Sequence, residues 1–114
     1  MDKLNTYSSA IKDALSDFAA VANRTPDPAA ETLCAFDDAR GHYLLLNAGW
    51  SGGHRLRGNT VFVRVRDGKV HIEEDWTEDG IADDLLRRGI PEDDLVLAFQ
   101  AAPPKMRRSG SAVA

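Results

Sequence analysis

The pattern of hydrophobic and polar positions begins with a helical segment at the N-terminus. Apolar residues recur there at steps of three and four, which is the spacing of one face of a helix of about five turns. The sequence Thr25-Pro26-Asp27-Pro28 predicts the end of this helix, because proline cannot continue it. The predicted buried stripe consists of Leu4, Tyr7, Ile11, Leu15, Phe18 and Ala22.

Two apolar runs between residues 31 and 50 flank a turn at residues 38–41 and predict an antiparallel hairpin. If the loop holds three residues, Asp38 faces His42 and Phe36 faces Leu44. Both faces of this hairpin are then largely apolar. One face carries Cys34, Phe36, Leu44, Leu46 and Trp50, and the other carries Leu33, Ala35, Tyr43, Leu45 and Asn47.

Residues 59–75 show strict alternation around Asp67-Gly68, which predicts a second hairpin with a type I′ turn. By this alternation Glu74 falls on the inward face beside Val61, either at the rim of the sheet or buried with a partner. The inward residues are Val61, Val63, Val65, Val70 and Ile72, and the outward residues are Phe62, Arg64, Arg66, His71, Glu73 and Asp75.

The next segment is punctuated like a helix, with Thr77 as its N-cap and Gly89 just after its C-terminus. Pro91 opens a tight or single helical turn, and residues 95–99 form a short apolar run that predicts a buried strand or core segment. The predicted fold class is therefore α+β. It consists of an N-terminal helix, a four-stranded antiparallel meander, a second helix and a short C-terminal apolar strand.

Composition and charge fit one acidic domain, at residues 1–104, followed by a short basic tail at residues 105–114. The chain has 114 residues, is 43% hydrophobic and 28% charged, and has a net charge of −4. Lys105, Arg107 and Arg108 lie in the last ten residues, so residues 1–104 hold 11 basic and 18 acidic side chains, a charge of −7. DNA-binding domains usually present a basic face, so direct nucleic-acid binding is not expected.

No sequence feature points to catalysis or to a membrane. Apolar runs are far shorter than the ~20 residues of a membrane span, and the first residues lack the pattern of a signal peptide. Cys34 is the single cysteine, which fits a reducing cytoplasm. No histidine or cysteine spacing suggests a metal, and no cofactor motif is present. Residues 49–53 match Gly-x-Ser-x-Gly, but a glycine turn and a strand follow instead of a helix.

Several motifs in a fixed order resemble the XisI-type proteins, the fdxN element excision controlling factors. The most specific are Trp50-x-Gly52-x-x-Arg55, Asp75-x-Thr77-Glu78-x-Gly80-Ile81-Ala82, Gly89-Ile90-Pro91 and Asp94-x-Val96-Leu97-x-Phe99. The resemblance extends over nearly the whole chain. The sequence departs from the pattern at Trp76 and Ala98, where small residues are expected, and at Arg108 and Ser111, where aromatic residues are expected.

The resemblance implies an accessory role in programmed DNA rearrangement, as in filamentous cyanobacteria, beside an XisH-type nuclease-like partner. It implies no enzymatic activity and supplies no catalytic residue. We expect a cytoplasmic protein that forms a homo-oligomer and contacts this partner, in the manner of an antitoxin. The candidate interface is the predicted apolar sheet face opposite the helices, with Leu33, Tyr43, Leu45 and Phe62. The alternative is that the C-terminal segment or the second helix covers this face.

The sequence leaves two other hypotheses open. A small enzyme or small-molecule-binding protein would use a pocket near Trp50, Arg55 and Glu74. A direct DNA-binding protein would use Arg107 and Arg108, and its affinity would fall steeply with salt.

Overall fold

The computed structural model describes residues 3–24, 30–51, 53–55, 59–77 and 79–100. Thr25–Pro28, the domain boundary at residue 104 and the basic tail with Arg107 and Arg108 lie outside these residues. The elements are α1 (Lys3–Ala22), β1 (Ala30–Asp37), β2 (His42–Ser51), β3 (His54–Arg55), β4 (Asn59–Arg66), β5 (Lys69–Asp75), α2 (Ala82–Arg87), the 3₁₀ turn η1 (Glu92–Asp94), β6 (Leu95–Leu97) and the 3₁₀ turn η2 (Ala98–Gln100).

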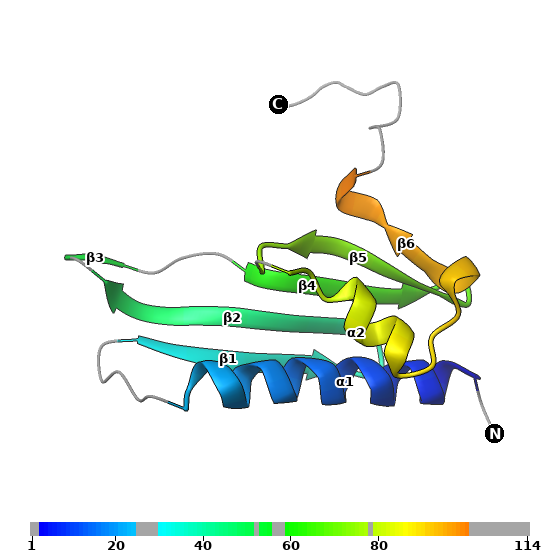
Figure 1. Ribbon diagram of the computed structural model, residues 1–114, viewed down its shortest axis with the longest axis horizontal. Coiled ribbons are helices and arrows are strands. Elements are labelled where there is room, and N and C mark those ends of the chain that lie inside the picture. Colours follow the sequence, from blue (N-terminus) through cyan, green and yellow to red (C-terminus); the bar gives the residue numbers. More distant parts are fainter. Residues whose placement is uncertain (1–2, 25–29, 52, 56–58, 78, 101–114) are drawn as a thin grey trace.

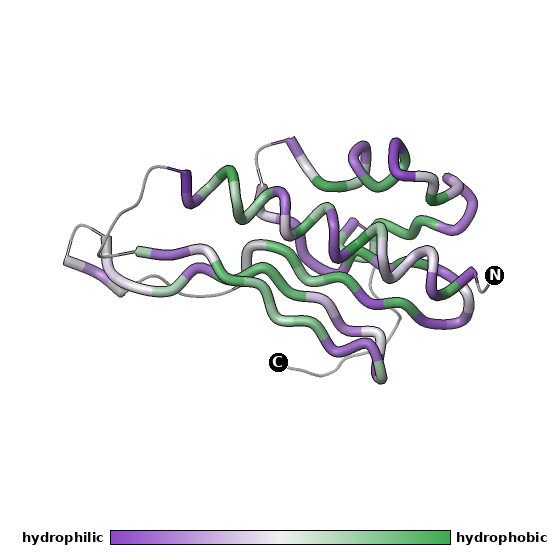
Figure 2. The backbone as a smooth tube through the Cα atoms, turned by 90° about the horizontal axis from the view of Figure 1, so that it is seen from below, coloured by the Kyte–Doolittle hydropathy of each residue, from purple (hydrophilic) through white to green (hydrophobic). Residues whose placement is uncertain are grey.

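The fold is α+β, as the sequence predicts. The strands lie in the order β1-β2-β4-β5-β6, and β3 pairs with β2 outside this order. The first four strands of this order form the predicted antiparallel meander, whereas β6 runs parallel to β5. Both helices lie on one side of the sheet (Figures 1 and 2). Neither α-helix of the described part has the length and apolar composition that a bilayer span requires.

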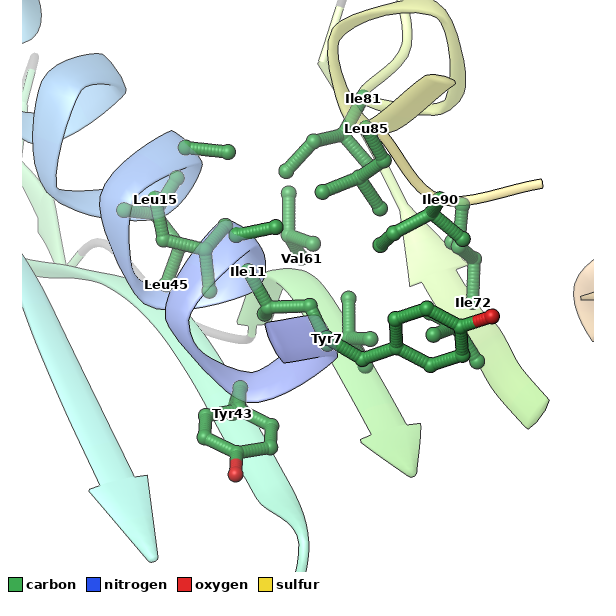
Figure 3. Close-up of a cluster of buried hydrophobic side chains, with 14 residues drawn as sticks. Tyr7, Ile11, Leu15, Tyr43, Leu45, Val61, Ile72, Ile81, Leu85 and Ile90 are labelled. Atoms are coloured by element: carbon green, nitrogen blue, oxygen red, sulfur yellow. The ribbon is translucent and has the colours of Figure 1, made fainter. Parts of the chain in front are cut away.

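The core lies between α1, α2 and the helix-facing side of the sheet (Figure 3). Ile11 and Leu15 of α1 are fully buried, and Ala10 and Ala14 let the helix approach the strands closely. The predicted stripe is only partly correct, because Leu4 and Phe18 are each 42% exposed. The other core residues are Tyr7, Tyr43, Leu45, Val61, Val63, Val70, Ile72, Ile81, Leu85 and Ile90.

The register between β1 and β2 differs by one residue from the predicted register. Asp37, not Asp38, pairs with His42, so the loop holds four residues and Phe36 pairs with Tyr43. The Asp37 carbonyl accepts the Gly41 N–H at 2.8 Å, which closes this longer turn. A slip of one residue moves every side chain of a strand to the other face.

The second hairpin has the predicted turn but contains a bulge that the alternation does not reveal. Asp67 and Gly68 have φ of 56° and 74°, as a type I′ turn requires. The register shifts between Phe62 and Val63, so Asp75 pairs with Val61 while Glu74 pairs with Phe62. Glu74 is therefore exposed, and the prediction that it faces inward beside Val61 is wrong.

The second helix ends as predicted but begins later. Gly89 has φ of 107°; its N–H donates to Leu86 at 3.1 Å and the Ile90 N–H donates to Leu85 at 3.2 Å, which is a Schellman motif. Because α2 begins only at Ala82 and spans six residues, its N-cap position is Ile81 instead of Thr77. Residues 95–99 are less buried than predicted, because β6 is a half-buried edge strand and Phe99 is 46% exposed.

We predict that Gly41→Ala destabilises the fold more than Gly53→Ala. Both glycines have φ near +75° (72° and 81°), so alanine is strained at either position. Only at residue 41 would the new Cβ lie 2.6 Å from a backbone atom, the Val65 carbonyl oxygen. Urea unfolding should show a loss of about 2–4 kcal/mol for Gly41→Ala and about 1–2 kcal/mol for Gly53→Ala. Equal losses would contradict the steric explanation.

A polar contact fastens the start of α1 to η1. The Tyr7 hydroxyl donates a hydrogen bond to Asp94, and Lys3 Nζ lies 3.1 Å from the same carboxylate. These contacts, with the Tyr7 hydrogen bond first, hold the pKa of Asp94 below 3.8. The carboxylate raises the pKa of Tyr7 from 10.0 to about 12.

We predict that this contact stabilises the fold between moderately acid and moderately alkaline pH. Because the folded pKa of Asp94 is lowered, its contribution is present above pH 3.8 and is lost as the pH falls through the folded value. Because the pKa of Tyr7 is raised, its contribution is lost as the pH rises from 10 to about 12. Asp94→Asn should therefore reduce the unfolding midpoint in urea at neutral pH, and the reduction should shrink in acid. A difference that is constant with pH would contradict this assignment.

Candidate interaction surface

The sheet face that points away from α1 and α2, here called the open face, carries a continuous apolar cluster. Tyr43 and Leu45 are buried beneath the helices, so their neighbours Leu44 and Leu46 point to the open face. Cross-strand pairing extends the cluster over three strands. Leu33 of β1 pairs with Leu46, and Leu44 pairs with Ala35 on one side and Phe62 of β4 on the other.

Only half of the predicted interface lies on this face. Leu33, which is 40% exposed, and Phe62 are placed as predicted. Tyr43 and Leu45 are wrong, because both are fully buried in the core. The Tyr43 hydroxyl lies 2.8 Å from Asp38 Oδ1, to which it donates, and 2.8 Å from Ser8 Oγ. The open-face cluster, a name used below for Leu33, Leu44, Leu46 and Phe62, replaces the predicted set.

A polar row borders the open-face cluster on the neighbouring register positions. His42, Arg64 and His71 face one another across β2, β4 and β5. The His42 ring packs edge-on against Phe62 with centroids 6.0 Å apart, and Arg64 Nε lies 3.1 Å from Glu73. The charge of Arg64 is thus neutralised locally. The border is polar but nearly uncharged, like the rim of a protein interface.

The predicted pocket of Trp50, Arg55 and Glu74 does not assemble. The backbones of Trp50 and Arg55 pair between β2 and β3, and Trp50 is 51% exposed. Glu74 lies opposite Phe62, which pairs with Leu44, six residues before Trp50 on β2. At about 3.4 Å per residue this places Glu74 on the order of 20 Å from the other two. The three residues cannot contact one ligand of ordinary metabolite size.

A shallow cavity of about 470 Å³ lies instead between α1 and the end of α2. Its charged groups are Asp13 and Arg88. Arg88 is occupied by Asp17 at 2.8 Å and by Asp84 at 3.0 Å, and these carboxylates raise its pKa. The cavity therefore lacks a free cationic group for an anionic ligand. Its remaining lining residues are Asn5, Thr6, Ser9 and Ala10.

The single cysteine and the candidate metal ligands of the described part of the chain bear on reactivity and on metal binding. Burial raises the pKa of the Cys34 thiol, whose sulfur lies 3.5 Å from the Leu15 carbonyl oxygen, so the nucleophilic thiolate is disfavoured. Among the described residues, no group of three histidine, cysteine or acidic side chains could hold a metal ion. Within the same residues, His71 Nε2 is buried without a hydrogen-bond partner.

The loop between β5 and α2 is organised by one carboxylate. Asp75 Oδ1 accepts the Thr77 N–H at 3.0 Å and also the Thr77 hydroxyl, while Oδ2 accepts the Ile81 N–H at 2.7 Å. The Thr77 hydroxyl oxygen in turn accepts the Gly80 N–H at 3.1 Å. Asp75 therefore holds both ends of the loop. Trp76, between two of these anchored residues, is 78% exposed.

Sequence reasoning missed Leu44 and Leu46 because it assumed a three-residue loop. One signal was available: a buried Tyr43 needs a partner for its hydroxyl, and Asp38 supplies one only if it belongs to the loop. The exposure of Trp76 had no sequence signal beyond its departure from the XisI-type pattern.

The described residues form a small α+β domain with both α-helices on one face of the sheet and the partly exposed open-face cluster on the other. Comparison with known proteins identifies its family. The sequence matches the profile of the XisI protein family over residues 1–113, and the chain belongs to the XisI family. No significant match is found among curated proteins.

Two solved structures from Anabaena variabilis are similar along most of their length. A XisI-like protein is 30% identical, with a TM-score of 0.78 over 86% of this chain and 88% of that one. The fdxN element excision controlling factor XisI is 33% identical, with a TM-score of 0.75 over 88% of this chain and 95% of that one. The α+β fold of this chain is thus that of XisI structures.

Within the described residues, the motifs that resemble the XisI-type pattern have structural roles. Asp75, Thr77, Gly80 and Ile81 build the loop before α2, and Gly89-Ile90 ends that helix. Trp50 and Arg55 pair across the turn between β2 and β3. In this chain these residues therefore shape the loop, the helix end and the strand pairing of the fold.

We predict that Asp75→Ala lowers the free energy of unfolding by about 2–3 kcal/mol, because it leaves the Thr77 and Ile81 N–H groups without their acceptor. Chemical denaturation of the variant measures this loss. Asp79→Ala is the matched control: this exposed acid of the same loop should change stability by no more than about 0.5 kcal/mol. Similar effects of the two changes would show that Asp75 does not organise the loop.

Proposed function

We propose that this protein is a non-enzymatic controlling factor for programmed excision of a DNA element, acting through contact with other proteins. Its family and its similarity to the fdxN element excision controlling factor support the role. The observation that carries the mode of action is the open-face cluster. An apolar cluster spanning three strands without a helix over it is the usual mark of an interface.

The proposed partner is an XisH-type nuclease-like protein. The open-face cluster supplies apolar contact area, and the His42–Arg64–His71 row supplies a polar rim. The acidic charge of residues 1–104 argues against direct DNA binding and favours a partner with a basic, nucleic-acid-binding surface. In this arrangement the protein restrains or positions the partner near DNA, in the manner of an antitoxin. The protein also forms a homo-oligomer through the same face.

The open-face proposal is tested with Leu44→Asp and Leu33→Asp, which place a charge in the cluster. Each should abolish co-elution with an XisH-type partner at micromolar concentration in size exclusion with light scattering. Burying one unpaired carboxylate costs several kcal/mol, enough to weaken a micromolar complex beyond detection. Leu33→Asp should disturb the folded protein less than Leu44→Asp, because the Leu33 side chain is already 40% exposed.

The matched control is Val21→Asp, which makes the same chemical change on α1, where Val21 is 58% exposed. It should co-elute like the unmodified protein, and far-UV circular dichroism should show that all three variants are folded. Failure of the unmodified protein to bind the partner would overturn the proposed function. Binding that survives both open-face changes would move the interface to another surface.

A further inference from the structure

Trp76 is presented to solvent by a loop that is fixed on both sides. Its side chain is 78% exposed, the largest value among the exposed apolar side chains of the described residues. The Thr77 and Ile81 N–H groups donate hydrogen bonds to the Asp75 carboxylate, which anchors the loop backbone on both sides of Trp76. A partner that contacts this ring therefore has less backbone conformational entropy to remove. Tryptophan is also the residue most enriched among those that dominate binding energy at interfaces.

The surroundings of Trp76 are strongly acidic. Residues 73–86 contain seven acidic residues and no lysine or arginine. Three of the acids are occupied: Glu73 by Arg64, Asp84 by Arg88, and Asp75 by the loop. In the part of the chain that the structure describes, Glu74, Asp79 and Asp83 have no ion-pair partner, and all three are exposed. An exposed indole ring that is flanked in the sequence by exposed, unpaired carboxylates favours cations over phosphates.

We infer that the Trp76 loop is a docking site for an arginine- or lysine-rich segment of a partner protein. A guanidinium or ammonium group stacks on the exposed indole, and the carboxylates of Glu74, Asp79 and Asp83 neutralise the flanking basic residues. Nucleic acid also stacks on tryptophan, but its phosphates would meet only negative charge here. The site adjoins the open-face cluster at Glu74, which pairs with Phe62, and Trp76 itself lies outside that cluster. The inference deepens the proposed function, on which it rests for a protein partner with a basic surface.

Intrinsic fluorescence of the full chain can report on this site directly. The chain has two tryptophans, so Trp50→Phe leaves Trp76 as the only indole. Titration with an oligoarginine peptide at low salt should change Trp76 emission in a saturable way. Oligoglutamate should have no effect. An absence of any change with oligoarginine would overturn the inference.

Anisotropy of a labelled oligoarginine peptide separates the indole from general charge attraction. Trp76→Ala should weaken binding about fivefold, as expected for the loss of one cation–π contact. The combined change Glu74→Gln, Asp79→Asn and Asp83→Asn should weaken it about tenfold. The matched control, Asp13→Asn, Glu92→Gln and Asp93→Asn, removes the same charge from exposed residues elsewhere and should have a smaller effect.

Three results would overturn the site. Unchanged affinity in Trp76→Ala, or equal loss in both triple variants, would mean that the peptide follows net charge alone. Oligothymidylate binding that equals or exceeds oligoarginine binding would make the loop a nucleic-acid site. The Leu33→Asp variant keeps the tests separate: it should lose the XisH-type partner yet bind oligoarginine normally. If the unmodified protein binds oligoarginine through Trp76 but no XisH-type partner, only the proposed function fails.

Discussion

The register between β1 and β2 is the constraint on which the rest of this molecule depends. Both faces of this hairpin are apolar, so hydrophobicity alone does not decide which face is buried. The four-residue turn sets the pairing, and a Cβ on Gly41 would lie 2.6 Å from the Val65 carbonyl oxygen. This pairing buries Tyr43 and Leu45 on the helix side and places Leu44 and Leu46, both half-buried, on the open face. The register of this one strand pair thus determines both which residues form the core and which form the open-face cluster.

The two proposed binding regions differ in character. The open face is largely apolar, with Arg64 paired with Glu73 and with Glu74 exposed at its edge opposite Phe62. The Trp76 loop combines an exposed aromatic ring with uncompensated acids. Binding to the first region would depend on shape complementarity and on the apolar area buried. Binding to the second would depend on charge and on long-range electrostatic attraction. A partner with an apolar patch beside a basic segment could use both regions, and their effects on affinity and on association rate would differ.

The sequence predicts those parts of this fold that local chemistry determines. The Asp67-Gly68 turn, the glycine stop after α2 and the alternation from Val61 to Ile72 all occur as expected. The failures that changed the candidate site are matters of counting along a strand. A loop longer by one residue exchanged the two faces of β2, and a bulge after Phe62 exchanged Glu74 and Asp75. The candidate site depended on these faces, so only Leu33 and Phe62 were placed correctly. Non-local backbone geometry, which fixes both shifts, leaves little trace in residue order.

The parallel pairing of β6 with β5 makes the edge of the sheet depend on contacts that are distant in the sequence. Parallel strands need a crossover connection, and α2 and η1 lie in the one between β5 and β6. Directly before β6, Asp94 of η1 contacts Tyr7 and Lys3 of α1. Loop-closure entropy opposes such non-local contacts more than it opposes a hairpin. The edge of the sheet and the start of α1 are therefore held together by the same short segment.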